Sequence, residues 1–197
     1  MKDKILNPFA LWVSRYVSAG LMTIIALLFG IASAASVLLG QYSMALILWI
    51  INRILDGLDG QIARASRTQS DEGGYLDIVC DFIVYALIPV AISLQKGSRA
   101  SYISTLFLLA AFYVNSATWM YLSALLEKRA AGAAAQNEST SVTISRGLIE
   151  GTETVLFYTL FLLFPRYYVF SASIMAALTV IGALLRTAKG YSILKNK

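Results

Sequence analysis

Long apolar stretches, each interrupted by only a few charged residues, follow one another along most of the chain. A helix needs about 20 mainly apolar residues to cross a bilayer. The pattern therefore predicts an all-α membrane protein with six transmembrane helices, whose ends are set to within a few residues. The predicted spans are residues 17–39, 43–66, 74–95, 100–126, 146–164 and 167–188.

The segment before the first span has a different pattern. Residues 3–15 mix apolar positions with Trp12 and basic side chains, which is typical of an amphipathic helix lying among the lipid headgroups. We therefore expect an N-terminal interfacial helix. The expected organisation is a single membrane domain of residues 1–197, with the interfacial helix over 1–16 and a six-helix bundle over 17–190.

Composition excludes several classes of protein. Hydrophobic residues make up 58% of the chain and charged residues 14%, and the mean hydropathy is +0.68, whereas a soluble domain has roughly 25% charged residues. The chain has no histidine and one cysteine, Cys80, which excludes Ser-His triads, the usual zinc sites and a disulfide framework. Acid–base chemistry must therefore rest on carboxylates, Lys, Arg, Tyr or a bound metal.

Basic residues divide unequally between the two sides of the predicted bundle. Cytoplasmic segments carry an excess of Lys and Arg, so we expect a bacterial inner-membrane protein with both termini in the cytoplasm. A signal peptide ending near Ala34 is the alternative for the first span, but its cleavage would remove one of six spans. Twelve basic residues fall on the side of the termini (Lys2, Lys4, Arg15, Arg64, Arg67, Lys128, Arg129, Arg146, Arg186, Lys189, Lys195 and Lys197) and three on the other (Lys96, Arg99 and Arg166).

Four aspartates flank the short polar segment between the second and third spans. Asp56 and Asp59 are three residues apart, and Asp77 and Asp81 are four apart, so each pair lies on one face of its helix. A short connection makes the two spans an antiparallel hairpin, with both pairs at similar depth near its cytoplasmic end. Each ionised aspartate within a membrane costs up to ~2.5–3.5 kcal/mol, and mutual repulsion adds to that cost.

One or two divalent cations would offset these charges, and oxygen ligands favour Mg²⁺, Mn²⁺ or Ca²⁺. The structural alternative is that the aspartates cap helix ends or pair with arginine, for which Arg53 and Arg64 are candidates. Gly57 and Gly60 leave one helix face bare, either for close helix packing or for a bulky polar ligand. Arg64 would meet a phosphate at the membrane surface. The pattern therefore predicts a metal-bridged diphosphate site facing the cytoplasm.

The same residues resemble a family signature. Asp56-x-x-Asp59-Gly60-x-x-Ala63-Arg64, followed after eight residues by Gly73-x-x-x-Asp77-x-x-x-Asp81, is similar to the motif of the CDP-alcohol phosphatidyltransferases at all eight fixed positions. The stretch from Ser18 to Gly30 also resembles the family layout, although Ala19 stands where many members have proline.

This resemblance implies an enzyme that transfers the phosphoalcohol group of a CDP-alcohol to an acceptor hydroxyl and releases CMP. It implies Mg²⁺ or Mn²⁺ as cofactor, as two ions, and a homodimer as the assembly. It also implies Asp81 as the general base. The implied metal ligands are Asp56, Asp59, Asp77 and Asp81, and the implied nucleotide contacts are Gly60, Ala63, Arg64, Ser70, Gly73, Gly20, Met22 and Thr23.

Candidate acceptor contacts lie in the last two spans. Arg146, Glu150 and Glu153 would share one face of a helix at spacings i, i+4 and i+7, either as a stabilising ion pair or as the lining of an acceptor pocket. A Gly-x-x-x-Gly pair ending at Gly151 would allow close helix approach. Arg186 would hold an acceptor phosphate, or serve only as a positive-inside residue.

The expected substrates are CDP-diacylglycerol and a small polar alcohol, and the bilayer is the other expected partner; no nucleic acid is expected. One alternative is a CDP-amino-alcohol donor with a diacylglycerol acceptor. Alternatives of a different class are an ion-coupled transporter, because intramembrane acids also mark ion pathways, and a non-catalytic scaffold.

Overall fold

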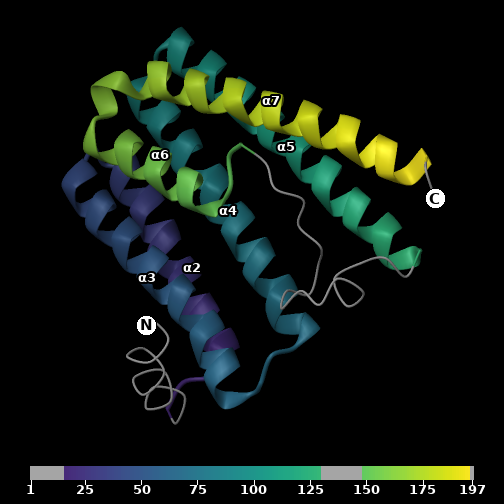
Figure 1. Ribbon diagram of the computed structural model, residues 1–197. Helices are drawn as coiled ribbons and strands as arrows, with labels where there is room; N and C mark the ends of the chain where they lie inside the picture. Colours follow the sequence, from purple (N-terminus) through teal and green to yellow (C-terminus); the bar gives the residue numbers. More distant parts are fainter. Residues whose placement is uncertain (1–15, 130–147, 196–197) are drawn as a thin grey trace. The chain divides into compact units, whose positions relative to one another are not determined.

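The computed structural model describes residues 16–129 and 148–195, all in helices, turns and short connections, with no strand in these ranges. Residues 1–15 lie outside them, so the interfacial helix predicted over 1–16 stays a prediction. The chain divides after Lys96 into two compact units, coloured purple to teal and teal to yellow in Figure 1. Each unit is described by itself, and the single domain over 1–197 also stays a prediction.

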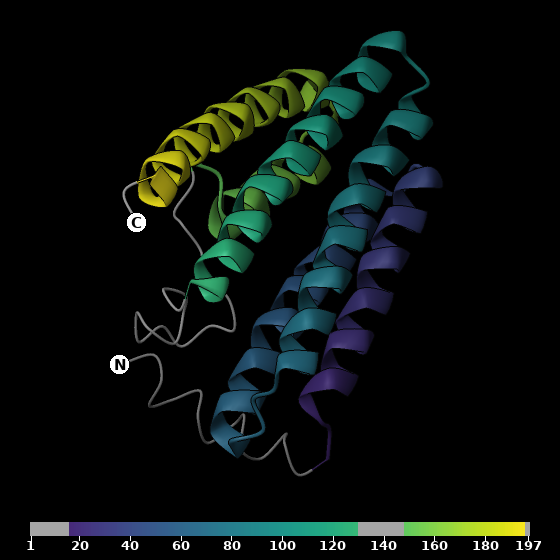
Figure 2. The ribbon, with the colours of Figure 1, turned by 90° about the vertical axis from the view of Figure 1, so that its right-hand side faces the viewer.

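The first unit consists of three helices that lie side by side in both views (Figures 1 and 2). Helix α2 packs along both of the others. The predicted spans 17–39, 43–66 and 74–95 match these helices to within a few residues. Their bounds are α2 Ala19–Leu38, α3 Tyr42–Ser66 and α4 Asp71–Lys96.

A four-residue connection joins α3 to α4. Helix α3 ends at Arg67, which adopts the left-handed conformation (φ 57°), and the Thr68 N–H then bonds the Ala63 carbonyl at 2.9 Å, as in a Schellman cap. Helix α4 starts with the Ser70 hydroxyl accepting from the Gly73 N–H at 3.2 Å. These two caps produce the antiparallel hairpin that the sequence predicted.

Helix α2 can approach both neighbours because Gly30 lacks a side chain. A Cβ added to Gly30 would lie 2.4 Å from Val84 Cγ2 on α4 and 3.2 Å from Asn52 Nδ2 on α3. One turn earlier, the Ala26 carbonyl accepts a hydrogen bond from Asn52 Nδ2 at 2.7 Å. Small residues and interhelical hydrogen bonds are the usual means by which membrane helices associate.

The second unit contains α5 Arg99–Lys128, α6 Gly151–Leu163, the 3-10 turn Pro165–Tyr167 and α7 Tyr168–Lys195. Helices α5 and α7 pack along each other, and the shorter α6 packs on α7. Aromatic side chains fill its core at the start of α7, where the Phe161 and Tyr168 rings meet edge to face at 5.2 Å.

Four helical stretches among the described residues are long and apolar enough to cross a membrane: α2, α4, α5 and Pro165–Lys195. The protein is therefore an all-helical, multi-pass membrane protein. The count of six spans is not confirmed. Helix α3 has 25 residues but carries four charged side chains from Arg53 to Arg64, and α6 has 13 residues, which at about 20 Å is shorter than a ~30 Å hydrocarbon core.

Candidate active site

The four predicted aspartates lie together in the first unit, on the half of the α3–α4 hairpin that adjoins its connection. Helix α3 carries Asp56 and Asp59, and α4 carries Asp77 and Asp81. The Asp56 carboxylate interacts electrostatically with the other three, and Asp77 with Asp59 and Asp81. The four carboxylates, here called the aspartate cluster, therefore lie within electrostatic range of one another.

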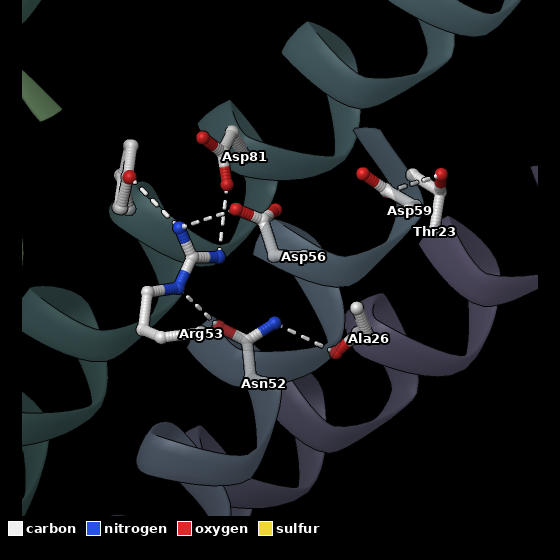
Figure 3. A network of polar contacts seen from close by, with 8 residues as sticks. Thr23, Ala26, Asn52, Arg53, Asp56, Asp59 and Asp81 are labelled. Carbon is white, nitrogen blue, oxygen red and sulfur yellow. Dashed lines mark hydrogen bonds and ion pairs between the residues drawn. The ribbon is translucent and has the colours of Figure 1, made fainter. Parts of the chain in front are cut away.

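Arg53 joins α3 to α4 through the aspartate cluster (Figure 3). Its Nη2 donates to Asp81 Oδ1 at 2.9 Å, and its Nη1 lies 3.4 Å from Asp56 Oδ2. Nη1 also donates to the Tyr85 hydroxyl at 2.9 Å. The guanidinium carbon lies 4.8 Å from the centroid of the Trp49 ring and 5.3 Å from that of Tyr85, so two aromatic rings add cation–π attraction.

Asn52 connects this arginine to helix α2. Its Oδ1 accepts from Arg53 Nε at 2.7 Å, while its Nδ2 donates to the Ala26 carbonyl at 2.7 Å. Asn52 is 1% exposed, and both ends of its amide are hydrogen-bonded, as a buried polar group requires. A chain of contacts therefore runs from the backbone of α2 through Asn52 and Arg53 to Asp56 and Asp81.

Asp59 is oriented separately, by α2. The Thr23 hydroxyl donates to Asp59 Oδ2 at 2.6 Å, and Figure 3 shows these two side chains pointing toward each other. Asp59 is 6% exposed, whereas the side chains of Asp56 and Asp81 are each 25% exposed. Thr23, predicted as a nucleotide contact, thus contacts a predicted metal ligand directly.

The space beside the first aspartate pair is open. Among residues 16–129 and 148–195, a Cβ added to Gly57 would meet nothing within 4 Å, and one added to Gly60 would lie 3.2 Å from Nη1 of Arg64, the flexible end of a side chain of the same helix. Close packing between helices, as at Gly30, therefore does not account for these two glycines. The open space favours the other alternative, in which a polar ligand lies there.

Four of the remaining predicted nucleotide residues lie at or near the connection between α3 and α4. Arg64 is exposed. Ser70 and Gly73 form the N-terminal cap of α4, and Ala63 takes part in the C-terminal cap of α3. These residues therefore lie at the hairpin connection, close along the chain to the aspartate cluster.

Two further predicted nucleotide residues, Gly20 and Met22, lie on α2 and differ in how closely they are packed. At Gly20, an added Cβ would lie 4.0 Å from Leu76 Cδ2, its one neighbour within 4 Å among the described residues. Met22 is 6% exposed and packs beside Ile62 in the core. We therefore assign a packing role to the Met22 side chain.

The aspartate cluster suits a divalent cation by its chemistry, since carboxylate oxygens are hard donors. In the arrangement seen here, Arg53 is the cation that joins Asp56 to Asp81. Within residues 16–129 and 148–195, no three Asp, Glu, Cys or His side chains are grouped as a ready metal site. A metal would therefore bind to carboxylates that are already in contact with an arginine.

The predicted helical face of the acceptor residues is wrong for the two glutamates that the structure describes. Helix α6 begins at Gly151, and Glu150 is its N-cap with extended backbone (φ −121°, ψ −165°). Glu153 Oε2 accepts from the Glu150 N–H at 3.1 Å, as in a capping box. This cap starts the helix after Glu150, so Glu150 and Glu153 do not share a helical face. Arg146 lies outside the described residues.

Arg186 is buried on α7, at 4% exposed. Its Nη1 donates to Asn115 Oδ1 on α5 at 2.7 Å, and it interacts electrostatically with Glu150. One turn earlier, a Cβ on Gly182 would lie 3.1 Å from the Leu148 backbone nitrogen, so the segment before α6 lies against α7. The structure thus brings Glu150 close to Arg186. Within the described part of the chain, an added Cβ at Gly151 would meet nothing within 4 Å, so no close helix approach at Gly151 is seen there.

The sequence of residues 16–185 matches the CDP-alcohol phosphatidyltransferase family. The chain belongs to this family. It is an integral-membrane enzyme of phospholipid synthesis, which transfers a phosphoalcohol group from a CDP-alcohol to an acceptor hydroxyl and releases CMP. Membership decides against the transporter alternative. Enzymes of the family use divalent metal ions.

Individual relatives extend this comparison. The chain is 34% identical over 175 residues to the inner membrane protein YnjF of Escherichia coli (strain K12), covering 89% of this chain and 84% of YnjF. It is 43% identical over 60 residues to the bifunctional IPC transferase and DIPP synthase of Thermococcus kodakarensis, covering 30% of this chain and 14% of that protein.

A solved structure shares the fold. The crystal structure of Mycobacterium tuberculosis phosphatidylinositol phosphate synthase (PgsA1) with CDP-DAG bound matches with a TM-score of 0.75 and 21% sequence identity. The match covers 95% of this chain and 94% of that one.

Proposed function

We propose that this enzyme transfers the phosphatidyl group of CDP-diacylglycerol to the hydroxyl of a small polar alcohol at the aspartate cluster. The observation that carries the proposal is the convergence of four carboxylates from α3 and α4 beside the open space at Gly57. The family match and the structural likeness to a synthase crystallised with CDP-DAG support the choice of donor.

The aspartate cluster would hold two ions of Mg²⁺ or Mn²⁺, with Asp56, Asp59, Asp77 and Asp81 as ligands. When bound, such ions neutralise the charge on the phosphate oxygens during phosphoryl transfer. Asp59 reaches its position through the hydrogen bond from Thr23, which orients one carboxylate before any ligand arrives.

Asp81 is the proposed general base, which accepts the proton of the acceptor hydroxyl. Its carboxylate is 25% exposed, accepts from Arg53 Nη2 at Oδ1, and is also hydrogen-bonded to the Tyr85 side chain. An ionised carboxylate has about four lone-pair sites, so these contacts leave acceptor sites for the proton of the acceptor hydroxyl.

The nucleotide would lie along the hairpin connection. Gly57 and Gly60 leave room for it, and the exposed Arg64 offers a fork of donors to a phosphate. The other proposed contacts are with Ala63, Ser70 and Gly73 at the hairpin connection and with Gly20, Met22 and Thr23 on α2; at Met22 the contact would come from the backbone.

In the second unit, we propose Arg186 and Glu150 as acceptor contacts. Arg186 is held by Asn115, and its burial strengthens its attraction for an anion. Arg146 remains part of the proposal. The carboxylate of Glu153 is engaged by the backbone N–H of Glu150, so we assign Glu153 to the helix cap.

We further propose six spans in the bacterial inner membrane, with both termini and the aspartate cluster on the cytoplasmic side. The bias of basic residues toward that side supports the orientation, and the name of the relative YnjF supports the membrane. The proposed assembly is a homodimer.

An acceptor screen tests the proposed function. Purified full-length protein in nanodiscs is incubated with Mg²⁺, CDP-diacylglycerol and one alcohol at a time (glycerol 3-phosphate, inositol, inositol phosphate, serine or choline), and CMP and the lipid product are measured. One alcohol should produce CMP and a new phospholipid, and Asp59→Asn should remove both. CMP release only from CDP-ethanolamine or CDP-choline with diacylglycerol would instead establish the alternative donor class. No CMP from either donor class would refute the proposal.

A further inference from the structure

Arg53 is held in the aspartate cluster by contacts on every side of its guanidinium. Nη1 and Nη2 contact Asp56, Asp81 and the Tyr85 hydroxyl. Nε donates to Asn52 Oδ1 at 2.7 Å. Only 11% of the side chain is exposed, so its position is fixed by the fold.

Arginine rather than lysine suits this position. Its guanidinium is always charged and presents donors in a rigid planar fork, and here the fork reaches two carboxylates and a hydroxyl at once. The rings of Trp49 and Tyr85 attract the same cation. A lysine would keep the charge but could not make all of these contacts.

The contacts of Arg53 leave the carboxylates able to bind something else. Arg53 donates to Asp81 Oδ1 and lies near Asp56 Oδ2, and each ionised carboxylate offers about four lone-pair sites. Asp59 accepts hydrogen bonds from the Thr23 hydroxyl and from the Gly60 backbone N–H. The contacts of Arg53 therefore use only part of the acceptor capacity of the aspartate cluster, which is compatible with a divalent cation binding beside Arg53.

We propose that Arg53 is a resident cation of the active site, which remains bound to Asp56 and Asp81 when metal binds and which weakens the affinity of the aspartate cluster for divalent cations. This inference rests on the proposed function, in which the aspartate cluster binds the metal. Arg53 makes no contact with the reacting atoms in the proposal and acts by positioning and by charge.

The charge balance of the metal-loaded site explains how Arg53 would affect the binding of donor and metal. Four ionised aspartates and two divalent cations cancel, and Arg53 then leaves an excess of one positive charge. That excess attracts the negatively charged diphosphate of the donor. The same charge repels an incoming metal ion, because like charges at short range in a partly buried site interact strongly.

These effects predict changes in opposite directions when the charge is removed. Mn²⁺ binding to the purified full-length protein is measured by electron paramagnetic resonance of the free ion, and donor binding by calorimetry with CDP-diacylglycerol at saturating Mn²⁺. In Arg53→Gln, the affinity for Mn²⁺ should rise about tenfold, while the affinity for the donor and the turnover fall about tenfold or more. Damage to the fold would weaken both kinds of binding together.

Two further variants separate charge from shape. Arg53→Lys keeps the charge, so Mn²⁺ affinity should stay within about twofold of the unmutated protein while turnover falls because the fork is lost. Arg53→Met is a second neutral variant, whose unbranched side chain can fill the space between Trp49 and Tyr85 if Arg53→Gln does not fold. Arg99→Gln is the control, because it removes an exposed positive charge in the other unit and should change neither measurement.

The variant Asp77→Asn distinguishes a failure of the resident-cation proposal from a failure of the proposed metal site. If Asp77→Asn abolishes Mn²⁺ binding but the neutral Arg53 variants bind Mn²⁺ as the unmutated protein does, or more weakly, the resident-cation proposal is wrong and the metal site stands. If Mn²⁺ binding is unaffected by Asp77→Asn and Asp59→Asn, the aspartate cluster is not the metal site and both proposals fail.

Discussion

Thr23 donates its hydroxyl hydrogen to Asp59 across 36 positions of sequence, at 2.6 Å, and so fixes a carboxylate on α3 from α2. The same hydroxyl lies 3.1 Å from the Ala19 carbonyl of its own helix. Because a hydroxyl has a single hydrogen, the bond to Asp59 competes with this local one. The shorter distance, 2.6 Å against 3.1 Å, identifies the Asp59 carboxyl group as the preferred partner.

Replacing Thr23 tests that bond. Thr23→Val keeps the shape but removes the donor, and a hydrogen bond to a charged group contributes about 1.5–3 kcal/mol, so turnover should fall about 10- to 100-fold. Thr23→Ser should recover most of it. Thr179→Val is the matched control, since the buried Thr179 hydroxyl donates to the carbonyl of Met175, one turn earlier in its own helix. CMP release measures all three, and native turnover in Thr23→Val would contradict the role.

Chelation tests the metal. EDTA should abolish CMP release, because four neighbouring carboxylates then lack the cations that the reaction uses. Mg²⁺ or Mn²⁺ should restore it, and Asp56→Ala should bind neither metal nor CDP-donor. Full turnover in excess chelator would show that the aspartate cluster works without a metal.

Asp81→Asn separates proton transfer from metal binding. The amide oxygen can still accept the bond from Arg53 Nη2 that the carboxylate accepts at 2.9 Å, but the amide cannot act as a base. Turnover should fall about 10²–10⁴-fold, while donor binding survives because the amide keeps one oxygen that can coordinate metal beside Asp56, Asp59 and Asp77. Calorimetry and CMP release, each titrated with Mg²⁺, measure the two effects. Rescue of turnover by saturating Mg²⁺ alone would make Asp81 a ligand and not the base.

Two glycines should respond in opposite ways to the same change. Gly30→Ala places a Cβ 2.4 Å from Val84 Cγ2, and overpacking of this kind costs about 1–3 kcal/mol, so thermal stability should fall. Gly57→Ala meets no neighbour within 4 Å among the residues that the structure describes and should gain up to about 1 kcal/mol of helix propensity. Its cost should appear as weaker donor binding. Thermal unfolding and calorimetry with the donor are measured on both variants. Unchanged donor affinity in Gly57→Ala and Gly57→Leu would show that the donor does not bind in the open space beside Gly57.

The orientation can be measured with two exposed glutamines at opposite ends of α3. In a Cys80→Ala background, where the one native cysteine is buried, Gln41→Cys should react with a membrane-impermeant maleimide in intact cells. Gln69→Cys should react only after the membrane is opened, because the hairpin connection is predicted to be cytoplasmic. The reverse labelling would place the aspartate cluster on the other side of the membrane.

Local patterns in the chain were enough to predict the helices of the first unit and the identity of the aspartate cluster. Apolar stretches of span length predict helices because the bilayer leaves no other way to satisfy the backbone. Spacings of three and four place Asp56 with Asp59 and Asp77 with Asp81 because they follow from helical periodicity alone. The family signature depends on the same local spacing.

The start of α6 was predicted wrongly because a helix cap, and not hydropathy, sets where this helix begins. Apolar content extended the predicted span back to residue 146, but the backbone of Glu150 is extended and Glu153 caps it. A capping box consists of only two residues, yet here it determines the first residue of the helix more strongly than the hydropathy of the surrounding residues does.

Sequence alone determined that this is a helical membrane protein with two pairs of aspartates, each pair on one helix face, because hydropathy and chain-neighbour spacing suffice for both. Only the tertiary structure decided how those aspartates are held. Thr23 reaches Asp59 from another helix, and Asn52 links the backbone of α2 to Arg53, which in turn reaches Asp81 on α4. Contacts between helices depend on how closely their backbones approach, and the side chains between them limit that approach. At Gly30 no side chain intervenes, so α2 can lie close to both α3 and α4.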